Sequence, residues 1–265
     1  MADETQCTAN TGAVRIDTAN THLDGSGTLS TLITGGSNGT FISKVFIKAI
    51  TNTSSGMIRF FIDDGSGTNI RLIKEINVIA NNKASIQPAF ETSFNLNYNL
   101  KANYTLSVST EVGNTFNIVA IGRDWTYYST NVRMDTTKLT ANTGSVNIAT
   151  ANSNLDGTGT LGVAFTAGSS STYKGAAVSS ITVKGSVNVT PGMVRLYIDD
   201  LTTKFCFTEI MIPSVTKSAT DQSFERTIVF DEPLYLKAGY KIQASTQVAE
   251  NYHVCVEAND WNYYS

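Results

Sequence analysis

The chain has 265 residues, carries only 15% charged residues and has a formal net charge of −3 at pH 7. An average soluble domain has roughly 25% charged residues, yet 41% of this chain is hydrophobic, which argues against a disordered protein. Nothing here provides a basic field for nucleic acid, and no stretch approaches the roughly 18 apolar residues that span a bilayer. We therefore expect neither nucleic acid nor a membrane as a partner. The first residues show no secretory signal pattern.

Apolar and polar residues alternate with a period of two, which predicts strands rather than helices. Val45 and Ile47, for example, alternate with Lys44 and Lys48. Turn-forming residues such as Asp, Gly, Ser and Asn separate the alternating runs. In chain order, the strands expected in the first half lie near residues 13–17, 29–34, 42–50, 57–63, 70–79, 88–95, 104–110 and 115–122.

The second half repeats the first. The segment Gly56-Met-Ile-Arg-Phe-Phe-Ile-Asp-Asp64 recurs as Gly192-Met-Val-Arg-Leu-Tyr-Ile-Asp-Asp200, and Asp124-Trp-Thr-Tyr-Tyr-Ser129 recurs as Asp260-Trp-Asn-Tyr-Tyr-Ser265. The alternation keeps the same phase in both copies, so the same positions face the core. The sequence predicts an all-β protein with two tandem, homologous, jelly-roll-like β-sandwich domains of about eight strands each, at residues 1–130 and 131–265.

The chain has few cysteines and histidines, which argues against a disulfide framework and against a metal site with several histidines. The three cysteines, Cys7, Cys206 and Cys255, form no close pair, which favours reduced thiols over a disulfide framework. His253, Cys255 and Glu257 alternate along one expected strand and are residue types that bind zinc, but the first copy has Asn117, Val119 and Ile121 there. A solvent-exposed face or a domain contact is the simpler interpretation. We expect no metal and no cofactor.

The paired carboxylates Asp63-Asp64 and Asp199-Asp200 are the most enzyme-like feature, because paired carboxylates can perform acid–base chemistry. Each pair ends an apolar run and enters a turn, where Asp bonds its own backbone, and we favour that interpretation. The calcium-loop spacing that begins at Asp64 lacks the required Gly, since Asn69 stands in its place.

The remaining candidates also have structural interpretations. The segments that begin at Asp24 and Asp156 are Gly-rich but lack a following helix and a Lys, so they predict tight turns rather than phosphate loops. Arg59 and Arg195 interrupt apolar strands and need acidic partners, which predicts a structural ion pair in each copy. The matched carboxylates Glu75 and Glu209, and Glu91 and Glu225, belong to separate domains. No catalytic residue emerges, and we expect no enzyme.

An aromatic segment ends each copy. These aromatic residues can close the sandwich core, form an interface or stack on sugars, and we favour closure of the core by the Trp with one Tyr outside. The possible interface residues are Trp125, Tyr127, Tyr128, Trp261, Tyr263 and Tyr264.

The segments Gly39-Thr-Phe-Ile-Ser-Lys-Val-Phe-Ile-Lys48, Gly56 to Asp64 and Lys74-Glu-Ile76, with Ala244 to Gln247, resemble a β-sandwich module of tailed-bacteriophage virion proteins. The resemblance covers most of both copies and implies a capsid auxiliary or decoration protein. It implies no cofactor and transfers no functional residue. It also implies location in the virion after synthesis in the host cytoplasm.

Four functional hypotheses follow. The first is a non-enzymatic auxiliary protein that binds the major capsid protein or other virion proteins, as a homo-oligomer or as lattice-bound copies. The second is a tail or head fibre module that recognises cell-surface glycan. The third is a double jelly-roll major capsid protein, which we rank lower because the two halves are so alike. A fourth reading, a glycan-active enzyme using a carboxylate pair, has little support.

Overall fold

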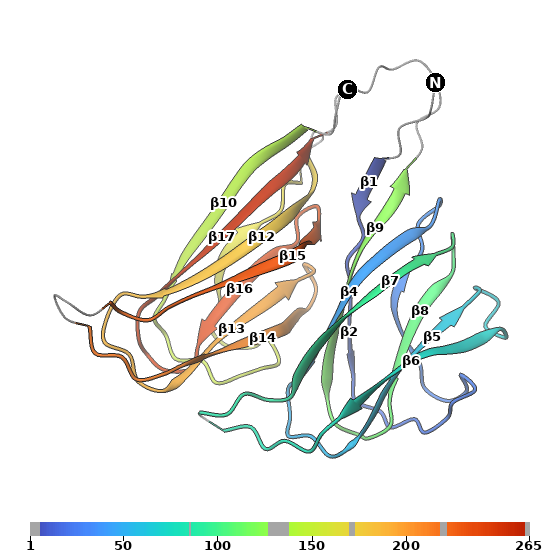
Figure 1. Cartoon of the computed structure of the whole chain (residues 1–265), viewed down its shortest axis with the longest axis horizontal. Helices are drawn as coiled ribbons and strands as arrows, with labels where there is room; N and C mark the ends of the chain where they lie inside the picture. The colour runs from blue at the N-terminus through green and yellow to red at the C-terminus, as the bar shows by residue number, and fades with distance from the viewer. Residues whose placement is uncertain (1–5, 85, 127–137, 170–172, 218–221, 263–265) are drawn as a thin grey trace. The chain divides into compact units, whose positions relative to one another are not determined.

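The computed structural model describes residues 6–84, 86–126, 138–169, 173–217 and 222–262. These residues fall into two compact units, one built from β1 to β9 and the other from β10 to β17 (Figure 1). Each unit is described by itself. The expected boundary between residues 130 and 131 lies outside the described residues, which contain strands and turns throughout and no helix.

The first unit contains two antiparallel sheets. Sheet 1A has the order β2–β9–β4–β7, with β1 pairing further along β9, and sheet 1B has the order β3–β8–β5–β6. Its strands are β1 (Gln6–Ala9), β2 (Gly12–Ile16), β3 (Ser30–Thr34), β4 (Thr40–Ala49), β5 (Gly56–Asp63), β6 (Ile70–Val78), β7 (Glu91–Leu100), β8 (Thr105–Thr110) and β9 (Phe116–Thr126).

The second unit repeats this topology. Sheet 2A has the order β10–β17–β12–β15 and sheet 2B the order β11–β16–β13–β14, so each strand number from β2 to β9, raised by eight, gives its counterpart. Its strands are β10 (Lys138–Ile148), β11 (Gly162–Thr166), β12 (Tyr173–Gly185), β13 (Gly192–Asp199), β14 (Lys204–Ile212), β15 (Glu225–Lys237), β16 (Lys241–Thr246) and β17 (Tyr252–Asn262).

This strand order is that of an eight-stranded jelly roll. The chain passes repeatedly between the two sheets of a unit, which places the first and last strands side by side in one sheet. Figure 1 shows the two sheets of each unit as separate layers. The all-β, tandem jelly-roll-like prediction is therefore confirmed, and the structure adds the strand order, which periodicity alone cannot give.

The core of each unit lies between its two sheets. Val45 and Ile47 are fully buried, as their alternation with the lysines predicts, and so is Ile42. Phe60 of sheet 1B meets Phe94 of sheet 1A edge to face, with 5.3 Å between ring centroids. Burial of such apolar side chains on both inner faces is the main favourable contribution to folding.

A glycine brings the two sheets together at the β2–β3 end of the sandwich. A Cβ atom on Gly12 would lie 2.0 Å from the carbonyl oxygen of Leu32, and one on Gly144 would lie 2.1 Å from that of Ala164. No other residue type fits at these two matched positions, because the facing atoms belong to the backbone.

Several predicted strand ends differ from the structure. The run at 88–95 becomes β7, which begins later and continues to Leu100, and β9 extends past Gly122 to Thr126. The sequence Gly122-Arg-Asp124 looks like a turn, yet Asp124 is held within the strand by hydrogen bonds from Asn10 and Thr40. The short strand β1 was not predicted, and a sheet partner rather than local propensity defines it.

Candidate functional site

In the first unit, the loop of residues 17–29 crosses the outer side of sheet 1B; we call it the first covering loop. It starts beside β8, where the amide of Asn20 donates to the carbonyl of Thr110 over 2.7 Å. It reaches β6, where a Cβ on Gly25 would lie 2.4 Å from the Ile70 side chain. Since this loop covers the outer side of β5, Phe60 and Phe61 are both fully buried although they point to opposite faces.

Arg59 of β5 fixes the first covering loop to the sheet. Its Nη1 donates to the backbone carbonyl of Asn20 over 3.1 Å. Its Nε and Nη2 form ion pairs with Glu75 and Glu111, each at 2.9 Å. Burial opposes the charged guanidinium, but the hydrogen bonds that Arg59 donates to the two carboxylates outweigh it and raise the pKa of Arg59.

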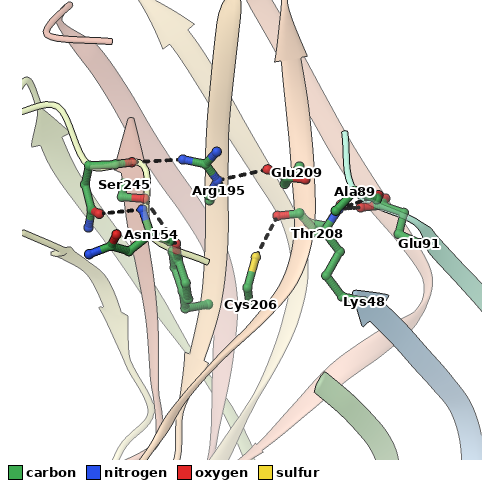
Figure 2. Close-up of polar contacts among 11 residues, drawn as sticks. Lys48, Ala89, Glu91, Asn154, Arg195, Cys206, Thr208, Glu209 and Ser245 are labelled. Carbon is green, nitrogen blue, oxygen red and sulfur yellow. Dashed lines mark hydrogen bonds and ion pairs between the residues drawn. The ribbon is translucent and has the colours of Figure 1, made fainter. Parts of the chain in front are cut away.

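The second unit builds the same arrangement beneath its own covering loop, residues 149–161. Arg195 donates to the carbonyl of Asn152 over 2.8 Å and pairs with Glu209 at 2.9 Å, as Figure 2 shows for the Arg195–Glu209 pair. The prediction of a structural ion pair in each copy is confirmed. In both units the arginine binds a loop carbonyl and a glutamate. These contacts explain its position in the strand, so a substrate-binding role has no support.

In each covering loop, the side chain of one asparagine holds the turn together by hydrogen bonds. The Asn20 side chain donates to the carbonyls of Ser26 and Thr28 and accepts from the amide of His22. Asn152 makes the same set of bonds in the second unit. The Gly-rich segments are therefore tight turns, as predicted. Hydrogen bonds from Ser26 lower the pKa of the exposed Asp24 carboxyl.

The paired aspartates cap turns. Asp63 accepts from the amides of Gly65 and Gly67, and Asp64 accepts from Ser66, whose side-chain and backbone bonds lower the pKa of Asp64. In the second unit, Asp199 and Asp200 accept amides of their own turn in the same way. This confirms the turn interpretation of all four carboxylates.

The matched glutamates pair within their own units. Glu91 lies 3.0 Å from Lys48, and Glu225 lies 2.9 Å from Lys184. Glu75 and Glu209 serve the arginines described above. Each of these carboxylates thus has an ion-pair partner on the neighbouring strand, and none needs a substrate to explain it.

The structure places two of the six possible interface aromatics. Trp125 is half-buried on β9. It lies on the same side of the strand as Arg123, whose guanidinium carbon is 6.0 Å from the Trp125 ring and 5.0 Å from that of Phe41. That side faces away from the inner residues Ile118 and Ala120, so Trp125 does not close the core and the favoured interpretation is wrong for this residue.

For the other five aromatic candidates, the structure gives little or no information about the side chain's surroundings. The backbone of Trp261 lies in β17 opposite Leu139. Its likeness to Trp125 does not extend to the neighbours, because Asn259 and Ala177 occupy the positions of Arg123 and Phe41. Tyr127, Tyr128, Tyr263 and Tyr264 lie outside the described residues.

His253, Cys255 and Glu257 share the exposed outer side of β17, as their spacing predicts. Glu257 accepts a hydrogen bond from Ser180. Within the described ranges, no group of three or more His, Cys, Asp or Glu side chains is placed to hold a metal ion. In the same ranges, we find no helix long and apolar enough to cross a membrane.

The sequence did not predict two contacts that the structure shows. One is the stacking of Arg123 between Phe41 and Trp125, which depends on the pairing of β4 with β9. The other is a hydrogen bond from the buried side chain of Tyr197 to the carbonyl of Asn154. The change from Phe61 to Tyr197 between the copies was the available signal, because a hydroxyl that replaces a buried phenyl hydrogen needs a partner.

Comparisons with known proteins give only a weak structural likeness. No family model and no curated protein matches the chain. The tandem CBM22-1–CBM22-2 domain of Paenibacillus barcinonensis Xyn10C is 10% identical, with 96% of this chain and 93% of that chain covered and a TM-score of 0.25. The STIV MCP is 12% identical over 97% and 96%, with a TM-score of 0.25. The major capsid protein P2 of bacteriophage PM2 is 10% identical over 99% and 98%, with a TM-score of 0.21.

Proposed function

We propose that this chain is a non-enzymatic virion structural protein that binds the capsid shell of a bacteriophage as an auxiliary or decoration protein. One observation carries the proposal: the chain builds the same jelly roll twice, with the same loop-fixing contacts at matched positions. Jelly rolls of this kind are typical of viral capsid and lectin domains. The sequence resemblance to tailed-phage modules favours the capsid context.

The charged residues that were candidates for catalysis or binding make contacts that agree with a structural role. The arginines and their glutamates fix covering loops, and the paired aspartates cap turns. Two like modules joined in one chain can bind two like neighbours on a lattice, and the second contact then forms at high effective concentration. The sparse charge suits such contacts, since the cores of protein interfaces are depleted in Lys and Glu.

The direct experiment mixes the purified chain with capsids that lack auxiliary proteins and images the particles. We expect saturable binding, with density for two jelly rolls per chain on the outer surface. A truncated single-unit chain, compared with the full chain, measures the avidity contribution. Full-strength binding by one unit would remove the argument from duplication, and no binding would remove the proposal.

A second candidate is a double jelly-roll major capsid protein. The observation that favours it is that both units have the complete strand order, which the sequence could not establish. This candidate predicts that the purified chain assembles into closed shells without another protein. A glycan-binding fibre module instead predicts signal on a glycan array and adsorption to cells. The three outcomes are distinct, so the experiments separate the candidates.

A further inference from the structure

Four polar side chains form a row across the outer face of sheet 1A. The register pairs Lys48 of β4 with Glu91 of β7 on one side and with Asn117 of β9 on the other. Asn117 is in turn paired with Arg15 of β2. The four side chains share one face, because directly paired residues of antiparallel strands point to the same side of the sheet.

The contacts within the row match the roles needed to join an amine to an amide. The Nζ atom of Lys48 lies 3.0 Å from Oε2 of Glu91 and also donates to the carbonyl of Ala89 over 3.0 Å. On the other side, Nε of Arg15 donates to Oδ1 of Asn117 over 3.1 Å. A carboxylate thus holds the nucleophile, and a cation polarises the carbonyl that would be attacked.

The next row on the same face is apolar at its centre. Phe46 and Val119, which are paired across β4 and β9, flank Lys48 and Asn117. Apolar neighbours lower the local dielectric and so strengthen the nearby electrostatic contacts. Directly paired residues have Cβ atoms about 5 Å apart, which is within reach of the lysine side chain.

We propose that Lys48 and Asn117 form an intramolecular isopeptide bond that links β4 to β9. Glu91 accepts a proton from the Lys48 ammonium, and the freed amine attacks Cγ of Asn117, whose oxygen is stabilised by Arg15. The Cγ–Nδ2 bond breaks as Glu91 passes both lysine protons, the first and then the second, to the departing nitrogen, which regenerates the Glu91 carboxylate. The products are one amide bond and one ammonium ion, so no oxidant or further reactant is needed. The row holds the reactants together, which gives the unimolecular reaction a high effective concentration.

The second unit provides a natural control. Its row contains the same ion pair, Lys184 with Glu225, but His253 replaces the asparagine opposite Lys184. An imidazole has no carbonyl carbon for the amine to attack, so this row retains a simple ion pair. The proposal therefore predicts one isopeptide bond per chain, in the first unit only.

The test is the intact mass of the full, denatured chain. We expect a mass lower than the sequence mass by one ammonia, and a cross-linked peptide that joins Lys48 to Asn117 in fragment spectra. Asn117→His, which copies the second unit, and Lys48→Arg each restore the sequence mass. Glu91→Gln slows the loss of ammonia without removing either reacting group. Circular dichroism verifies that each variant folds.

A second route to ammonia loss requires a control. Asn38 precedes Gly39, and such a pair can form a cyclic imide with the same change in mass. Mild alkali hydrolyses an imide but leaves an isopeptide bond intact. A mass equal to the sequence mass overturns the proposal, and so does an alkali-resistant deficit that persists in Asn117→His. Neither result bears on binding to capsids.

Discussion

The hydroxyl of Tyr197 lies 3.3 Å from the hydroxyl of Ser245, and it also donates to the carbonyl of Asn154 over 2.7 Å. The first unit has Phe61 and Ser109 at the matched positions, and the buried Ser109 hydroxyl has no hydrogen-bond partner. The two copies therefore differ at this point by one satisfied and one unsatisfied polar group.

Exchanging these residues should change stability in opposite directions. Phe61→Tyr supplies a partner for Ser109, so we expect the free energy of unfolding of the first unit to rise by about 1 kcal/mol. Tyr197→Phe leaves Ser245 and Asn154 without that hydroxyl and should lower the value for the second unit by about 1–2 kcal/mol. Hydrogen exchange of β8 and β16 peptides in the full chain measures each unit separately. Equal shifts of the same sign would contradict this explanation.

Removal of the Arg59 guanidinium should release the first covering loop. Glu75 and Glu111 are 40% and 33% exposed, so they can regain water, and we expect Arg59→Met to cost about 2 kcal/mol, less than a fully buried pair. Amides of residues 18–28 should exchange faster, whereas those of residues 150–160 in the second unit should not change. Arg59→Lys is the charge-matched control. Unchanged exchange in the loop would show that Arg59 does not hold it.

The glycine at the β2–β3 contact should be irreplaceable. Gly12→Ala places a methyl group against the Leu32 carbonyl, so we expect a loss of at least about 3 kcal/mol, because backbone atoms must shift. Gly67→Ala is the matched control: its φ of +71° is left-handed, but no atom lies within 4 Å. That change should cost about 1 kcal/mol. Thermal unfolding of both variants decides whether the close contact or the backbone angle matters more.

Acid should weaken the turns that are capped by Asp24 and Asp64. The pKa of each carboxyl is lowered in the folded chain by hydrogen bonds from Ser26 and Ser66. The folded state therefore binds fewer protons, so their contribution is complete above the unfolded pKa and is lost as pH falls through the lower, folded pKa. Unfolding midpoints between about pH 5 and about pH 2 should depend less on pH in Asp64→Asn than in the parent chain. An identical slope would contradict this assignment.

Alternation and repetition were sufficient to predict most of the fold. Val45 and Ile47 point inward, and Arg59 has its acidic partner, because a half-buried strand fixes the facing of each residue. Strand order was not predictable, because it depends on contacts between residues far apart in sequence. The covering loops were missed for the same reason: Asn20 and Arg59 meet only after β5 is in place.

The candidate interface was predicted less well. The aromatic ends were treated as equivalent, yet only Trp125 has Arg123 and Phe41 beside it. Those neighbours come from strand pairing, which a repeat of local sequence does not determine.

The most direct test of the proposed function is cryo-electron microscopy of capsids that lack auxiliary proteins, incubated with the full chain. We predict ordered density on the outer shell that accommodates both jelly rolls of each bound chain. Bare shells at saturating protein concentration, with the chain itself folded, would contradict the assignment as a capsid-binding virion protein.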